Sequence, residues 1–293
     1  MTTIIEKYFD ILNNNFFIKP YPKSYFELLK NTSIPDNFKI NYKYHDKMIS
    51  KAHDFVKIYD VNHKLASIVK SLSKQFKIDA NVANIDRMFY KKCCTSGIFP
   101  SIFGYEGFPK ASCISINNAI CHALPHEELL KDGDIVTFDV CGYNGIHSDM
   151  AQTYCIGNVS GKHRKLVNTT WDCLQNAIQR CKPGAHYRDI GFIIEKTAKD
   201  NGFVLVNGFS GHGINTQIHM KPLVENHYNR NNLLKMKIGD TFCIEPLLTI
   251  NNGDWYTGPD GFGILTKNGK RAAHFERTIL ITDSGYEVLN EVS

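Results

Sequence analysis

The sequence lacks the short motifs by which several enzyme and binding classes are recognised. None of its nine cysteines forms a CxxC pair, which excludes zinc fingers and thioredoxin-like redox sites. It contains no HExxH motif, no glycine-rich phosphate loop and no nucleophile elbow, so it carries no signature of a helix-based zinc protease, a nucleotide-binding enzyme or a serine hydrolase. Any catalytic site must therefore be assembled from residues that lie far apart in the chain.

Long hydrophobic runs and dense basic clusters are also missing. No stretch approaches the length needed to span a bilayer, and the N-terminal MTTIIEKYFD has no apolar secretion signal. The formal net charge of +5 over 293 residues predicts no specific nucleic-acid partner, although it would suit an RNA-rich surface such as a ribosome. Because an odd number of cysteines favours reduced thiols, we expect a soluble, monomeric, cytoplasmic protein with no membrane partner.

A chain of this length can form one large core with an appended arm. Residues 1–45 are rich in Asn, Lys and aromatic residues and are interrupted by Pro20, Pro22 and Pro35. We expect them to form an N-terminal arm packed along a main domain at 46–293. Within that domain, apolar residues at three- and four-residue steps predict helices, at 45–72, 80–92, 162–181 and 188–201.

The stretch at 136–154 predicts a hairpin that brings two acids together. Its alternating residues indicate two strands joined at Asn144 and Gly145, and Asn-Gly is a strong hairpin signal. A turn centred on Asn144 would place Asp139 and Asp149 directly opposite each other on one face. Because opposed like charges are destabilising and Asp139 ends an apolar run, we expect a metal site between them.

One short pattern occurs twice. KDGD at 131–134 is followed by an apolar run that ends at Asp139, and KIGD at 237–240 is followed by a similar run that ends at Glu245. The two lysines are 106 residues apart, and so are the two acids. Two related halves that each contribute a carboxylate to a shared centre would produce such an internal repeat.

Candidate metal ligands are spread between positions 139 and 276: Asp139, Asp149, His212, Glu245 and Glu276. His212 is flanked by glycines, which allow close approach of backbone and metal. Four carboxylates cannot share a small pocket without cations, because each would raise the pKa of its neighbours. We therefore expect two divalent ions bridged by two carboxylates. This oxygen-rich, thiolate-free set favours Mn, Fe or Co, with Zn as a further candidate.

Histidines outside this set are candidates for assisting roles. Paired ions would ionise a bridging water, and His122 and His219 could then serve as proton or oxyanion helpers. Cys121 and His122 form no cysteine-protease dyad, because adjacent strand residues point to opposite faces. The remaining histidines considered are expected at the surface: His126, His147 and His163.

The candidate residues occur in motifs that resemble those of type I methionine aminopeptidases. The matching segments are GFPKASCISINNAICHALP (107–125), DGDIVTFDVCGYNGIHSDMAQTYCIGNV (132–159), GHGINTQIHMKP (211–222), FCIEP (242–246) and PDGFGILTKNGKRAAHFERT (259–278). The resemblance covers roughly residues 40–293 and includes all five ligand motifs in order. It implies an α+β pita-bread fold, the fold of creatinase and aminopeptidases, in which a pseudo-twofold antiparallel sheet covered by helices holds a dinuclear metal site at its centre.

The resemblance also implies a role for each matching residue. The four acids and the one histidine named above would be the metal ligands, and Glu245 would also accept a proton from the attacking water. His122 would contact the substrate amide, and His219 would polarise the scissile carbonyl. The initiator methionine of a nascent polypeptide would bind between apolar and sulfur-bearing side chains, namely Tyr105, Phe108, Cys113, Ile218 and Phe262, with Ile102 at the edge.

The chain departs from the family pattern beside the expected pocket, where Phe262 replaces a usual Trp and His274 a usual Gln. The expected ligands are intact, and the long insertion of type II enzymes is missing. The implied activity is removal of an N-terminal methionine that precedes a small second residue. Two alternatives remain open: a proline-specific aminopeptidase of the same fold, with equivalent ligands, and a non-catalytic pita-bread module that binds peptides.

Overall fold

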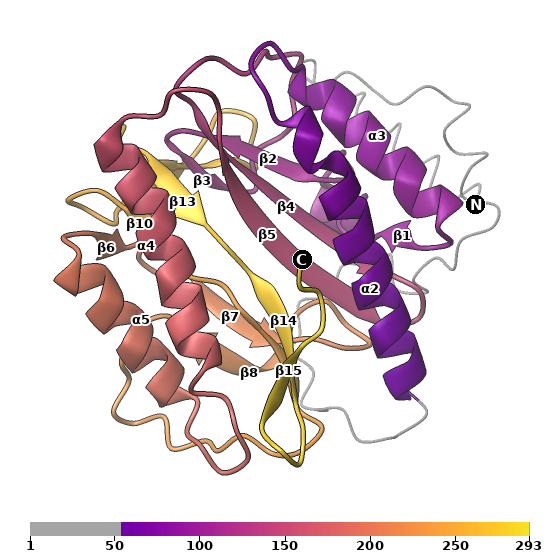
Figure 1. Ribbon diagram of the computed structural model, residues 1–293, viewed down its shortest axis with the longest axis vertical. Helices are drawn as coiled ribbons and strands as arrows, with labels where there is room; N and C mark the ends of the chain where they lie inside the picture. Colours follow the sequence, from indigo (N-terminus) through magenta and orange to yellow (C-terminus); the bar gives the residue numbers. More distant parts are fainter. Residues whose placement is uncertain (1–53, 293) are drawn as a thin grey trace.

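Figure 1 shows the computed structural model, which describes residues 54–292. Two helix pairs lie on one face of the strands, one pair over each half of the molecule (Figure 1). The helices are α2 (Asp54–Leu72), α3 (Val82–Thr95), α4 (Gly161–Ile178) and α5 (Arg188–Asp200), with 3-10 turns η2 (Ser73–Gln75) and η3 (Tyr105–Gly107). No described helix combines the length and apolar character needed to cross a membrane.

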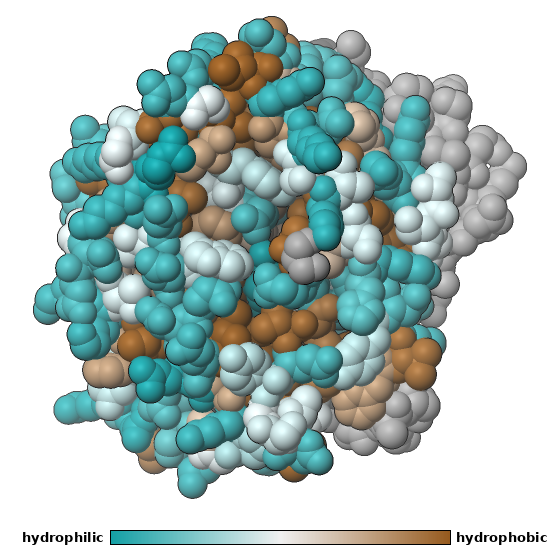
Figure 2. Space-filling model, in the orientation of Figure 1, coloured by the Kyte–Doolittle hydropathy of each residue, from teal (hydrophilic) through white to brown (hydrophobic). Residues whose placement is uncertain are grey.

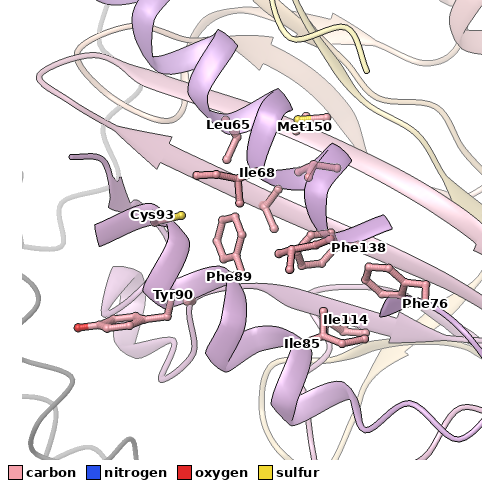
Figure 3. Packing of buried hydrophobic residues seen from close by; sticks show 14 of the residues in the cluster. Leu65, Ile68, Phe76, Ile85, Phe89, Tyr90, Cys93, Ile114, Phe138 and Met150 are labelled. Carbon is pink, nitrogen blue, oxygen red and sulfur yellow. The ribbon is translucent and has the colours of Figure 1, made fainter. Parts of the chain in front are cut away.

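The first half is built on a long hairpin. Strand β4 (Ile135–Tyr143) pairs with β5 (His147–Cys155) along one edge and with β1 (Phe99–Pro100) and β2 (Cys113–Ile116) along the other, all antiparallel. The buried residues of α2 and α3 cover this sheet in one cluster. Figure 3 shows Phe89 of α3 directed at Phe138 of β4, with ring centroids 5.5 Å apart and nearly perpendicular planes.

The second half repeats this arrangement. Its five-stranded sheet has the order β15 (Tyr286–Val288), β14 (Arg277–Ile281), β9 (Thr241–Ile244), β7 (Ser210–Gly213) and β8 (Met220–Glu225). Helices α4 and α5 bury their apolar faces in a second cluster against it, and Tyr187 meets Phe242 of β9 edge to face at 5.0 Å. Hydrophilic residues cover most of the outer surface of these helices (Figure 2), so their sequence periodicity separates a buried face from a solvated one.

Two small sheets and isolated bridges, one of which joins the two halves, complete the described strands. One sheet has the order β13 (Ala272–His274), β10 (Leu247–Thr249) and β6 (Val204–Leu205), and the other β11 (Trp255–Thr257), β12 (Ile264–Thr266) and β3 (Ala119–Cys121). Between the halves, Glu276 N–H donates to Ala151 O at 3.0 Å and Ala151 N–H donates to Glu276 O at 3.3 Å. The two halves thus meet at a residue expected to bind metal.

The repeated KDGD and KIGD segments form matching turns. In each, the aspartate carboxylate accepts a hydrogen bond at 2.8 Å from the backbone N–H of the lysine three residues earlier. The glycine of each turn, Gly133 or Gly239, has a φ of +89°, a conformation that glycine adopts without a Cβ penalty. Each turn directly precedes the central strand of its half, which is β4 after the first turn and β9 after the second. The prediction of two related halves is confirmed.

The prediction that Asp139 and Asp149 lie directly opposite each other is wrong. Asp139 pairs with Ala151, and Asp149 pairs with Cys141. Tyr143 pairs with His147, so the loop holds three residues, and the ladder is shifted by one pair from a turn centred on Asn144. Because side chains on one face recur every second residue, both acids still point to the same side of the hairpin.

Most other expectations about elements are confirmed with small shifts in their ends. Helices occur near 80–92, 162–181 and 188–201, and α2 covers the described part of 45–72. The chain through Glu245 is divided into β9 and β10 at Glu245 and Pro246, and residues 272–281 are divided into β13 and β14. Strand β15 was not expected. The expected arm at 1–45 lies outside the described residues.

Candidate active site

The five expected metal ligands come together where the two halves meet. His212 Nε2 lies 3.6 Å from Glu245 Oε1, 3.9 Å from Asp149 Oδ2 and 4.0 Å from Glu276 Oε1. Asp139 and Asp149 each offer an oxygen within 4.8 Å of the other's. The side chains of this cluster are buried or nearly so, and Glu245 is the most open at 13% exposure. Residues from four strand regions therefore surround one small volume.

Backbone geometry explains why the acids reach this centre. Asp139 and Asp149 occupy the same face of the β4–β5 hairpin, whereas Glu245 and Glu276 occupy breaks, one between β9 and β10 and the other between β13 and β14. Pro246 follows Glu245 and donates no hydrogen bond to a ladder. Neither glutamate lies within a continuous strand, and Glu276 pairs only through its isolated bridge to Ala151. Both side chains turn toward His212.

Glycines on both sides of His212 allow strand β7 to fit here. A Cβ at Gly211 would lie 2.1 Å from Cys243 O, and one at Gly213 would lie 2.2 Å from Lys221 O. Both contacts are with backbone atoms that cannot move aside as a flexible side chain could. The Gly-His-Gly pattern is therefore a steric requirement of the site.

Burial makes the charged forms of these acids electrostatically unfavourable without a cation. It raises the pKa of Asp149 to about 7, and burial together with the Asp149 charge holds the pKa of Asp139, Glu245 and Glu276 well above their usual range. Burial lowers the pKa of His212 to about 4, so this imidazole is neutral and suited to bind metal. Glu276 Oε1 is buried without a hydrogen-bond partner among the described residues. This donor set fits divalent cations.

Two thiols lie in the same cluster and were missed from the sequence. Cys141 Sγ donates to Asp149 Oδ1 at 3.0 Å, and Cys243 Sγ lies within 4.8 Å of ligand atoms of His212 and Glu276. Burial raises the pKa of both thiols well above the usual range. The expected ligand set was free of thiolates, and these groups are neutral donors beside it. Only their contacts in the fold reveal them, because neither forms a ligand motif in the sequence.

The helper histidines lie at the edge of this centre. The rings of His219 and His212 are nearly perpendicular, with centroids 4.4 Å apart, and Tyr105 Oη is 2.8 Å from His219 Nδ1. Burial and the neighbouring histidines lower the pKa of His219 well below its usual range. His122 follows β3 with a φ of +56°, and its side chain is exposed to solvent. Neutral imidazoles there could donate or accept a proton.

His147 contradicts the expectation of a surface position. It is 7% exposed, at the start of β5, and its Nδ1 lies 3.0 Å from Ser101 Oγ. Burial lowers its pKa to about 3, so it remains neutral. His126, by contrast, is exposed as expected, and His163 is partly exposed on α4.

The residues expected to form a methionine pocket lie in one apolar cluster. Phe108 and Phe262 meet edge to face, with ring centroids 5.4 Å apart. The cluster also contains Leu124 and Cys141, which were not expected; its full membership is Ile102, Tyr105, Phe108, Cys113, Leu124, Cys141, Ile218 and Phe262. Cys113 pairs with Asp139 across β2 and β4, and Cys141 pairs with Asp149. The apolar cluster therefore directly adjoins the acids.

Comparison with known proteins finds relatives that are named methionine aminopeptidases. Methionine aminopeptidase 1 of Dictyostelium discoideum is 42% identical over 219 residues, which are 73% of this chain and 59% of that protein. Methionine aminopeptidase 1A of Arabidopsis thaliana is 44% identical over 210 residues, 70% of this chain and 52% of that protein. The chain thus spans between about half and three fifths of the length of these relatives.

Solved structures resemble the whole described domain. The crystal structure of methionine aminopeptidase from Rickettsia prowazekii superposes with a TM-score of 0.81 at 29% identity, over 84% of this chain and 100% of that one. Prolidase from Pyrococcus furiosus superposes with a TM-score of 0.67 at 18% identity, over 84% of this chain and 66% of that one, and shows the fold alone. The expected α+β pita-bread fold is confirmed. The family model described as "Metallopeptidase family M24" matches residues 38–283 of this chain. Because the match covers most of the chain, the chain belongs to that family.

Proposed function

We propose that the chain is a metal-dependent aminopeptidase that hydrolyses the bond after an N-terminal methionine, in nascent proteins or peptides with a small second residue. As a member of a metallopeptidase family, it uses a divalent metal. The observation that carries the substrate assignment is the contact between the apolar cluster and the acids: Cys113 and Cys141 line the former and pair with Asp139 and Asp149 of the latter. An N-terminal methionine whose thioether side chain is held there would present the peptide bond that follows it to the metal centre.

The proposed metal centre contains two divalent ions held by Asp139, Asp149, His212, Glu245 and Glu276. Their oxygen-rich character favours Mn, Fe or Co, with Zn as a further candidate. When bound, such ions would polarise the substrate carbonyl and lower the pKa of a water molecule. Equally, they would relieve the repulsion among four buried carboxylates.

Protein groups would then move the protons. Glu245, the most exposed acid of the cluster, accepts a proton from the attacking water and returns it to the leaving amine. His219 donates a hydrogen bond to the developing oxyanion. If Tyr105 donates to His219 Nδ1, the imidazole carries its proton on Nε2, the nitrogen left for the substrate. His122, at the solvent-exposed side, contacts the substrate amide.

The test is hydrolysis by the purified full-length chain after loading with Mn, Fe, Co or Zn in turn. Met-Gly-containing peptides should be cleaved, and the Glu245→Ala variant should leave them intact. Preferential cleavage of Xaa-Pro peptides would instead assign a proline-specific aminopeptidase. Binding of peptide without cleavage under every metal would assign a non-catalytic module.

We further infer that the protein works as a monomer in the cytoplasm on nascent chains, with the ribosome as a candidate partner and no membrane or sequence-specific nucleic acid. All nine cysteines are free thiols, and eight of them are buried, which suits a reducing compartment. Size-exclusion chromatography with light scattering tests the monomer, and cosedimentation with ribosomes tests the partner. A dimer or an absence from the ribosomal pellet would contradict the respective inference.

A further inference from the structure

His274 is a buried histidine whose ring has no hydrogen-bond partner among the described residues. Its exposed fraction is 2%, and both Nδ1 and Nε2 are unpaired. A neutral imidazole has one donor and one acceptor, and leaving a buried polar group unpaired costs about 1–3 kcal/mol. Such a cost at the edge of the acid cluster requires a compensating role.

The backbone of His274 is held on both sides. It ends β13, where it pairs with Leu247 of β10. The hydroxyl of Thr153 on β5 donates to His274 O at 2.6 Å, and His274 N–H donates back to Thr153 Oγ1 at 3.1 Å. With both backbone groups engaged, Nε2 lies 4.0 Å from Glu245 Oε2.

Glu245 therefore lies between two imidazoles, with one carboxylate oxygen toward each. Oε1 is 3.6 Å from His212 Nε2, and Oε2 is 4.0 Å from His274 Nε2. The backbone of Glu245 is held, since its carbonyl accepts a hydrogen bond from Asn226 Nδ2 at 3.0 Å. Its carboxylate has no such support within the described part of the chain and is partly open at 13% exposure.

We infer that His274 is a positioning residue for Glu245, to which it donates a hydrogen bond from Nε2–H to Oε2. A small rotation of the Glu245 side chain, or one bridging water, closes the present distance of 4.0 Å. With Oε2 held by His274, Oε1 stays directed toward His212. Carboxylates that bind metals are commonly oriented in this way by an outer hydrogen-bond donor. The inference rests on the proposed function in one respect, that Glu245 is a metal ligand.

The test compares a substitution that keeps a donor with one that removes it. His274→Gln retains an N–H donor of similar reach, and His274→Leu retains an apolar body alone. The readout is Mn²⁺ affinity of metal-free full-length protein, measured by isothermal titration calorimetry. His274→Leu should bind Mn²⁺ about 10- to 100-fold more weakly, and His274→Gln should stay within about 3-fold of the parent protein. His63→Leu, an exposed position on α2, is the matched control and should change nothing.

Two results overturn the inference: unchanged affinity in both His274 variants, or an equal loss in both, which would indicate packing alone. If His274→Leu fails to fold, the protonation of the native ring decides. In the ¹⁵N spectrum of Zn²⁺-loaded parent protein, the His274 signal, assigned by its loss in His274→Gln, should show the proton on Nε2. A proton on Nδ1 would refute the proposed donor. Neither readout requires turnover, so a failure of the proposed peptidase activity remains distinguishable.

Discussion

Cys141 lies directly opposite Asp149 in the β4–β5 ladder, and its thiol donates a hydrogen bond to the Asp149 carboxylate at 3.0 Å. Because burial and the adjacent acids raise the pKa of the thiol well above its usual range, it remains a donor at neutral pH. Cys141 also lines the apolar cluster. One side chain thus orients an acid on one side and forms a wall of the proposed methionine pocket on the other.

Replacement of Cys141 should separate these two contributions. Cys141→Val removes the donor with little change in volume, and we expect about 10-fold weaker metal binding because Asp149 loses its orienting partner. Cys141→Ser keeps a donor and should retain affinity. Calorimetric titration of metal-free protein measures both. Cys173→Val, buried in α4 away from the acids, serves as control. Equal metal affinity in Cys141→Val and the parent protein would show that the hydrogen bond is unimportant.

The stability of the metal-free protein should fall as pH rises from 6.5 to 8.5. The folded-state pKa of Asp149 is raised to about 7, and burial and the neighbouring acids raise those of Asp139, Glu245 and Glu276 well above their usual range. The unfolded chain has already released these protons near its ordinary carboxyl pKa. Stabilisation from a raised pKa is therefore lost as pH rises through the folded value, by about 1.4 kcal/mol per pH unit for each proton retained.

Histidines act mainly below this pH window. The pKa values of buried His212 and His147 are lowered to about 4 and about 3, so their linked loss of stability occurs below pH 6.5, where the unfolded imidazole gains a proton. Chemical denaturation at pH 6.5, 7.5 and 8.5 measures the effect. Asp149→Asn should flatten the slope, and saturating metal should remove the part that comes from the acids, while buried thiols with raised pKa values still reduce stability near pH 8.5. A metal-free protein equally stable at all three pH values would contradict the buried acid cluster.

Tyr105 is expected to act on catalysis through His219. Tyr105→Phe removes the hydroxyl that lies 2.8 Å from His219 Nδ1 and leaves the tautomer of the imidazole unspecified. We expect kcat to fall about 10-fold with a small change in KM, because an oriented donor matters most as the oxyanion forms. His219→Ala should have a larger effect in the same direction. Steady-state kinetics on a Met-Gly peptide separate the two constants, and a pure rise in KM would argue against this role.

The sequence predicted those features of the site that have local signals. His212 lies between glycines that the fold requires, and the two K-x-G-D turns are self-contained units whose aspartates accept a backbone N–H three residues earlier. The acids stood out because they end or interrupt apolar runs. The convergence of His212, Glu245 and Glu276 then followed from resemblance to a family rather than from any rule of spacing.

Features that depend on neighbours from other parts of the chain escaped prediction. The register of the β4–β5 hairpin depends on a three-residue loop, which Asn144 and Gly145 alone do not distinguish from a shorter one. His147 is buried at the start of β5, where it contacts Ser101 from a distant part of the chain. His274 is buried at the end of β13. A single histidine carries no periodicity, so its burial cannot be read from the residues beside it.

Phe262 is expected to contribute to recognition of methionine. It is partly buried and packs edge to face on Phe108 at 5.4 Å, a contact worth about 0.5–1.5 kcal/mol beyond the buried area. Phe262→Ala should raise KM for a Met-Gly peptide about 10-fold while kcat changes little, since the ring belongs to the apolar cluster and has no proton to transfer. Kinetics on paired peptides that begin with Met or Leu provide the measurement. Unaltered discrimination between them would place the pocket elsewhere.

Asn290 should be essential for stability without taking part in chemistry. It is fully buried, its Nδ2 donates to Asp149 O at 2.7 Å, and its Oδ1 accepts from Thr278 N–H at 3.0 Å. Asn290→Leu would leave Thr278 N–H unpaired, and Asp149 O would keep the Thr278 hydroxyl as its donor at 2.9 Å. We therefore expect about 1–3 kcal/mol lower free energy of unfolding. Urea denaturation of metal-free protein at pH 6.5 measures this, with the exposed Asn231→Leu as control. A loss no larger than in the control would mean that water replaces the amide, and that the C-terminal segment does not support β5.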